Sequence, residues 1–126
     1  MRAVDTNVLV RLMTRDDPKQ LAAAEQFVAS GAWVPHLAVA EATRVLDSVY
    51  GRDADAVAAA VEMLLSHEHL TVQDEEVVAA AVGHVRRHPK VGFSDCLMLE
   101  VARKAGHLPL GTFDRGRSRI EGTQQL

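Results

Sequence analysis

The chain has few cysteine and aromatic residues and no long apolar run, and each shortage excludes a class of protein. The one cysteine, Cys96, cannot form a disulfide within the chain, which indicates a reducing compartment such as the cytoplasm. Aromatic residues make up 4%, and Ala and Val dominate the apolar residues. No apolar stretch approaches the roughly 20 residues needed to span a bilayer. Asp5 and Asn7 interrupt the only early apolar run, so we expect no secretory signal, no membrane partner and a cytoplasmic location.

The chain also lacks an excess of positive charge. Its 14 Lys and Arg against 17 Asp and Glu give a net charge of -3, which excludes a generally basic nucleic-acid-binding protein. Two segments, 84–90 and 115–119, are nevertheless cationic, and each lies beside a candidate functional acid. Such cations would allow a phosphate backbone to approach carboxylates that otherwise repel it. A run of charge alone is more often a solvated loop.

Length and composition are those of an ordinary globular domain. The 126 residues are 48% hydrophobic and 25% charged, enough to bury one core and too apolar for a disordered chain. There is no internal repeat, no low-complexity tract and no linker. We expect a single domain over residues 1–126.

Short apolar segments alternate with helical patterns along the chain. Asp17 and Pro18 form a strong helix start, Thr6 or Asn7 is expected to cap the first helix, and Ser94 or Asp95 the last. We expect helices over 8–13, 20–30, 37–50, 53–66, 74–88 and 95–104, strands at 2–4, 32–35, 70–72 and 108–113, and an edge strand in the tail after 120. This alternation predicts an α/β fold with a parallel sheet covered on both faces.

Four acids lie where such a fold can present them to a ligand. Asp5 and Asp114 follow expected strands, Glu41 lies in an apolar helical stretch, and Asp95 opens a helix. Each has a simpler explanation alone: a helix cap for Asp5, an ion pair with Arg44 for Glu41, a helix-terminal charge for Asp95 and a turn for Asp114. Gathered together, however, buried carboxylates need neutralising, most simply by a divalent cation. The set therefore indicates metal-dependent hydrolysis of phosphodiesters.

Two further signals carry less weight. His84 and His88 have the spacing of a zinc pair on a helix, but Arg86 and Arg87 lie between them and would repel a cation. Cys96 is interpreted as a small buried side chain and not as a nucleophile, because no His–acid partner is evident.

Four parts of the chain carry a resemblance to a known family, and they are residues 4–11, Glu41, residues 92–97 and residues 112–115. They come in the order found in the PIN-domain ribonucleases, which this chain resembles. It is most similar to the VapC toxins of bacterial type II toxin–antitoxin systems, and the opening run through Pro18 is especially similar. The resemblance covers nearly the whole chain.

The resemblance implies an α/β/α sandwich with a mainly parallel central sheet and Mg²⁺- or Mn²⁺-dependent cleavage of RNA by a metal-activated water. It also implies a homodimer and inhibition by a cognate antitoxin protein. Carried over by position, the site residues fall into four roles: catalytic acids (Asp5, Glu41, Asp95, Asp114), metal ligands (Asp5, Asp95, Asp114), supporting polar groups (Asn7, Thr112) and, as our hypothesis for charge on the RNA phosphate, cations (Arg11, Arg15, Arg115).

Two alternatives remain open. A phosphatase of the haloacid dehalogenase type also begins with a strand-end Asp, but it requires a second Asp two residues later, where this chain has Asn7. A non-catalytic module of the same fold would bind a partner through its apolar helices, although such a module has no need to retain four acids.

Overall fold

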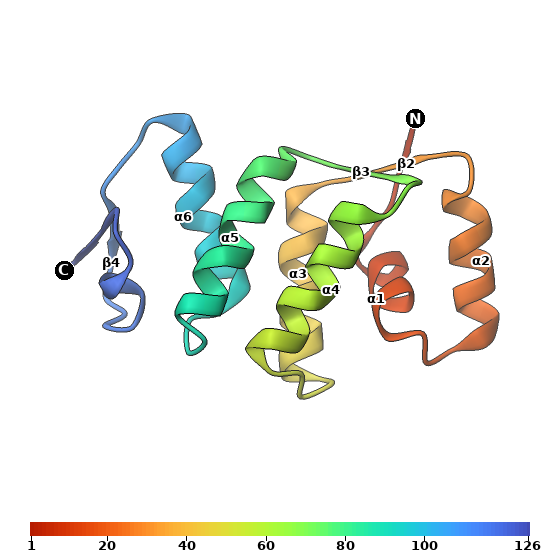
Figure 1. Cartoon of the computed structure of the whole chain (residues 1–126), viewed down its shortest axis with the longest axis horizontal. Coiled ribbons are helices and arrows are strands. Elements are labelled where there is room, and N and C mark those ends of the chain that lie inside the picture. The colour runs from red at the N-terminus through yellow and green to blue at the C-terminus, as the bar shows by residue number, and fades with distance from the viewer.

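The computed structural model describes all residues 1–126 and contains six α-helices and five short strands (Figure 1). The helices are α1 (Thr6–Thr14), α2 (Pro18–Val28), α3 (His36–Ser48), α4 (Ala54–Ser66), α5 (Glu75–Arg87) and α6 (Phe93–Ala105). The strands are β1 (Arg2–Ala3), β2 (Ala32–Val34), β3 (Leu70–Val72), β4 (Leu110–Thr112) and β5 (Thr123–Gln125). All pairings between strands are parallel, so the predicted α/β class is confirmed.

Aspartate side chains cap three of the helices. The carboxylates of Asp17, as the sequence predicted, and of Asp53 accept hydrogen bonds from backbone N–H groups three residues later. The predicted cap of the first helix, Thr6 or Asn7, was wrong. Asp5 takes that place, as its simpler explanation had it, because its backbone is extended and its Oδ1 accepts from Val8 N at 3.1 Å, which brings Thr6 and Asn7 into α1.

The last helix also begins earlier than the sequence predicted. Gly92 is the residue before α6, so neither Ser94 nor Asp95 caps it, and no side chain accepts from its first N–H groups. Asp95 therefore lies in the first turn of α6, where the helix dipole favours a negative charge. The consequence is that its carboxylate can bond to a group outside its own helix.

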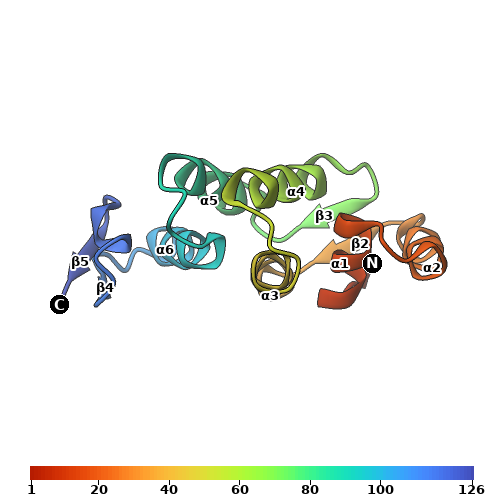
Figure 2. The same ribbon diagram turned by 90° about the horizontal axis from the view of Figure 1, so that it is seen from below.

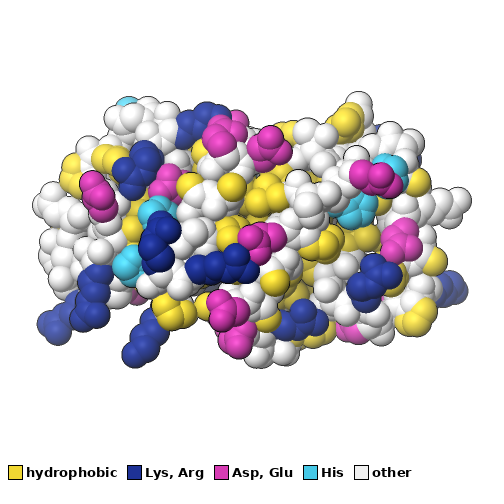
Figure 3. All heavy atoms as spheres, viewed as in Figure 1, with side chains coloured by type: hydrophobic (Ala, Val, Ile, Leu, Met, Phe, Trp, Pro, Cys, Tyr) yellow, Lys and Arg dark blue, Asp and Glu magenta, His cyan; other side chains and the backbone are white.

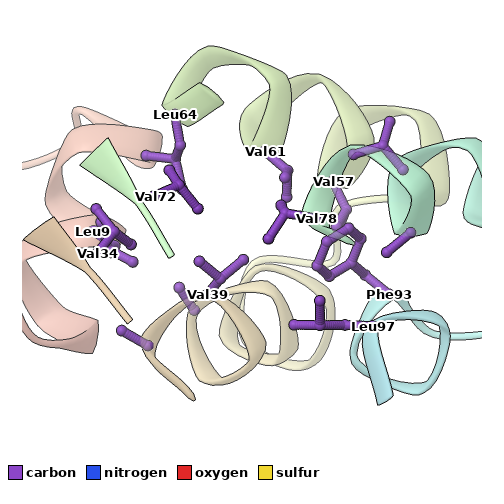
Figure 4. Close-up of a cluster of buried hydrophobic side chains, with 14 of the residues drawn as sticks. Leu9, Val34, Val39, Val57, Val61, Leu64, Val72, Val78, Phe93 and Leu97 are labelled. Atoms are coloured by element: carbon purple, nitrogen blue, oxygen red, sulfur yellow. The ribbon is translucent and has the colours of Figure 1, made fainter. Parts of the chain in front are cut away.

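Strands β1, β2 and β3 form one sheet in that order, and α4 covers one face of it while α1 and α3 cover the other (Figure 2). Thirty buried residues make a continuous apolar core. Side chains from the strands, including Val34 and Val72, meet Val39 of α3 and Val61 of α4 there (Figure 4). The core continues beneath α5 and α6 through Val78, Phe93 and Leu97. Each helix is too short or too polar to cross a lipid bilayer.

Strands β4 and β5 form a separate two-stranded sheet. This sheet lies beyond α6, at the opposite end of the molecule from β1–β2–β3 (Figures 1 and 2). The predicted edge strand in the tail is thus present as β5, paired with β4. Asp5 and Asp114 each follow a strand, as predicted, but the two strands belong to different sheets.

Candidate acidic site

The first two acids, Asp5 and Glu41, are positioned from the N-terminal half of the chain. Asp5 is exposed between β1 and α1, and Glu41 is exposed on α3. Thr6 Oγ1 donates a 2.6 Å hydrogen bond to Glu41 Oε2, which ties α1 to α3 beside Asp5. The simpler explanation of Glu41, an ion pair with Arg44, is not what the structure shows, because the partner of Glu41 is Thr6. Both acids are therefore held by uncharged donors, the Val8 N–H and the Thr6 hydroxyl.

The other two acids, Asp95 and Asp114, meet around Arg117. An ion pair joins Arg117 Nη2 to Asp95 Oδ1, and Arg117 N donates to Asp114 Oδ1 at 3.0 Å. The guanidinium Nε is buried without a hydrogen-bond partner. Asp114 N donates to Thr112 Oγ1 at 3.0 Å, so Thr112 supports the turn that carries Asp114. One arginine thus links the start of α6 to the turn after β4.

Arg117 was not singled out by the sequence, which marked it only as part of a cationic segment. A signal was present, because Arg117 follows Asp114 by the three-residue spacing at which an Asp side chain before a helical turn accepts a backbone N–H. That spacing accounts for the contact of Arg117 N with Asp114. It says nothing of Asp95, which lies on another element.

The donor chemistry of these acids suits a hard divalent cation, since all four offer carboxylate oxygens. Their arrangement does not fit such an ion, because no three Asp, Glu, His or Cys side chains lie close enough together to hold one. Asn7 is exposed and lines a groove of about 370 Å³ with Asp5 and Arg11. The structure therefore offers two separated groups of carboxylates and no assembled metal centre.

The three cations predicted to contact phosphate differ in their surroundings. Arg11 is held within the fold, with Nη1 at 2.7 Å from Asp16 Oδ1 and Nη2 donating to Tyr50 at 3.2 Å. The hydrogen bond with Tyr50 raises the pKa of Arg11, while hydrogen bonds from Thr14 and Tyr50, together with the charge of Arg11, lower the pKa of Asp16. Arg15 pairs with Glu25 at 3.2 Å, and Arg115 is exposed.

The signals that the sequence discounted have structural explanations. Cys96 is fully buried in α6, and burial raises its pKa to about 11, so the thiol stays protonated. This confirms its interpretation as a packing residue. His84 Nε2 contacts Glu100 Oε1, which is buried and also accepts from Arg103 Nε at 3.3 Å. His84 is thus engaged with a buried acid that the sequence did not single out.

Comparison with known proteins identifies the family of the chain. The sequence model for the PIN domain matches residues 2–122, which is nearly the entire chain and includes all four acids. A comparison with curated proteins finds no match.

Proposed function

The chain belongs to the PIN domain family, a family with a nuclease-type fold, and on that premise we propose that it is a metal-dependent endoribonuclease. PIN domains are generally nucleases and typically use divalent metal ions. The observation that carries the proposal is the positioning of the acids. Asp5 and Glu41 are oriented by neutral donors and Asp95 and Asp114 by Arg117, although neither pair is needed for the core.

Hydrolysis of a phosphodiester needs a proton acceptor for the attacking water and positive charge near the phosphate oxygens. Asp5, Glu41, Asp95 and Asp114 are the acids that we propose for this chemistry. The family resemblance implies Asp5, Asp95 and Asp114 as metal ligands, and these three would have to move closer together than they lie in the structure to hold one ion. Asn7 and Thr112 are the proposed supporting groups. The choice of Mg²⁺ or Mn²⁺ rests on the family and on the carboxylate donors.

We further propose the biological role of a toxin in a type II toxin–antitoxin system. This role is supported by the similarity of the opening run through Pro18 to the VapC toxins. It would make the protein a cytoplasmic homodimer whose RNA cleavage is blocked by a cognate antitoxin. Co-expression with a protein encoded beside it, followed by purification of a stable inactive complex, tests this role.

The nuclease proposal is tested with a folded RNA in the presence of Mg²⁺, Mn²⁺ or EDTA. We expect wild type to cut with either metal and not in EDTA, and Asp95→Asn to be inactive. Asp55→Asn, an exposed acid at the start of α4, is the matched control and should cut normally. Cutting by Asp95→Asn at the wild-type rate would refute the site. Binding of RNA without turnover, across several RNAs and both metals, would favour the non-catalytic module.

A further inference from the structure

Half of the unpaired cations of this protein line a single cleft. Of its 14 Lys and Arg residues, eight bind an acid, a histidine, a backbone carbonyl or a hydroxyl group through their side chains. The other six have no ion pair and no side-chain hydrogen bond, and they are Lys19, Arg44, Arg52, Lys90, Arg115 and Arg119. Three of these six, Arg44, Arg52 and Lys90, line a single cleft.

The cleft has a volume of about 610 Å³ and leads to one of the proposed catalytic acids. Its walls are the C-terminal half of α3, the start of α4, the α5–α6 loop and the first turn of α6, where Asp95 lies. Arg44 follows Glu41 by three residues on α3, so the two side chains share one side of that helix. In Figure 3, Lys and Arg side chains lie along the lower edge of the molecule, where the loops after α3 and α5 are found. The cleft therefore borders the proposed site.

The acids that line the same cleft do not cancel its positive charge. Asp95 is paired with Arg117, which is not part of the cleft wall. Asp53 caps α4, where the helix dipole offsets part of its charge. Asp47 alone lacks such a partner, which leaves three free cations against one free acid. A cleft with this balance attracts an anion larger than a single phosphate ion.

The lining also indicates what part of an anion it recognises. The one aromatic side chain among the lining residues, Phe93, is buried in the core and offers no exposed face on which a base could stack. Recognition by free cations without a stacking platform is directed to the phosphates of a nucleic acid and not to its bases.

We propose that this cleft binds the phosphate backbone of a single-stranded segment of the RNA substrate, with Arg44, Arg52 and Lys90 as its contacts. The inference rests on the proposed ribonuclease function and deepens it, because it states which surface the RNA strand follows next to the proposed catalytic acids. It adds to the predicted Arg11 and Arg15, which each pair with an acid, three cations that have no ion pair in the structure. Recognition through phosphates makes this contact independent of base sequence.

The test is equilibrium binding of a fluorescently labelled single-stranded RNA, measured by anisotropy in EDTA over a range of salt concentrations. EDTA prevents metal-dependent cleavage, so binding is measured apart from turnover. Wild type is compared with the combined Arg44→Gln, Arg52→Gln and Lys90→Gln variant. The control combines Lys19→Gln, Arg86→Gln and Lys104→Gln, which remove the same charge from exposed positions outside the cleft. Circular dichroism checks that both variants are folded.

We expect the cleft variant to bind at least about tenfold more weakly, with the slope of log K against log salt reduced by roughly 2, because each phosphate contact on a single strand contributes about 0.7. The control should keep most of the slope. Asp47→Asn, which removes the one free acid, should strengthen binding, a gain that misfolding cannot produce.

The outcomes separate this inference from the proposed function. Equal losses of RNA affinity in the cleft and control variants would overturn the proposal that the cleft binds RNA, even if wild type cuts RNA. So would the absence of RNA binding by wild type. A loss confined to the cleft variant supports the inference, and it does so whether or not the protein cleaves RNA with Mg²⁺ or Mn²⁺. If the cleft binds RNA but the protein does not cleave it, only the proposed ribonuclease function is overturned.

Discussion

The two groups of acids differ in the charge of what holds them. Asp5 and Glu41 accept hydrogen bonds from a backbone N–H and a hydroxyl, which orient the carboxylates and leave their negative charge uncompensated. Asp95 instead pairs with the guanidinium of Arg117, which compensates its charge directly, while Asp114 accepts from the backbone N–H of the same residue. A neutral donor leaves a carboxylate ready for a cationic ligand, whereas a guanidinium competes with one. The carboxylates of Asp5 and Glu41 are therefore oriented without loss of their charge, whereas the charge of Asp95 is compensated.

The largest effect is expected from Asp5→Asn. Asn caps a helix about as well as Asp, so α1 should keep its start while the carboxylate charge is lost. We expect RNA cleavage to fall by at least roughly a hundredfold, as is typical when a charged group of an active site is removed. Asp17→Asn makes the same change at the cap of α2 and should cut normally. Equal activity of the two variants would remove Asp5 from the site.

A smaller loss is expected when the neutral donor to Glu41 is removed. Thr6→Val keeps the shape of the side chain but cannot donate to Oε2, so Glu41 loses its orientation. Cleavage should fall by about tenfold, in the range found for groups that orient a ligand. Thr6→Ser retains the hydroxyl and should restore most of the activity. The comparison of kcat and KM for the three proteins checks this, and a Ser variant as poor as Val would contradict it.

Arg117→Gln is expected to lower the stability of the folded protein. It removes the cation that pairs with Asp95 at a partly exposed position and keeps the backbone N–H that donates to Asp114, and we expect a loss of about 1 kcal/mol in the free energy of unfolding. Urea denaturation measures this loss. Arg115→Gln removes a neighbouring exposed cation that has no ion pair and should leave the urea midpoint unchanged. Equal midpoints for the two variants would show that the Arg117 contact does not stabilise the C-terminal region.

The smallest effect is expected at Cys96, which adjoins Asp95 but faces the core. At about pH 8 the folded protein should resist alkylation and the urea-unfolded protein should react. The folded-state pKa of about 11 exceeds the ordinary value of 9.0, so the unfolded thiol ionises first as pH rises. Its contribution to stability is therefore present below about pH 9 and is lost between pH 9 and 11. Rapid alkylation of the folded protein would contradict the burial of this thiol.

Much of the local structure could be read from the sequence. The alternation of apolar segments located the strands and helices, and Asp17 with Pro18 marked a helix start correctly. The errors also lay close to helix ends. Asp5 displaced Thr6 and Asn7 as a cap, and Gly92 displaced Ser94 and Asp95, because several adjacent polar or small residues can each begin a helix.

The sequence alone determined the helices, the short strands, the apolar core positions and the order of the four acids along the chain. These depend on caps and periodic patterns that act over a few residues. Tertiary structure alone decided that Thr6 meets Glu41, that Arg117 meets Asp95, and that Arg44, Arg52 and Lys90 line one cleft. It also placed β1 and β4 in different sheets, so the acids that follow them lie in separate groups. The physical reason is that such meetings depend on how helices and strands pack in space, which no short-range pattern records.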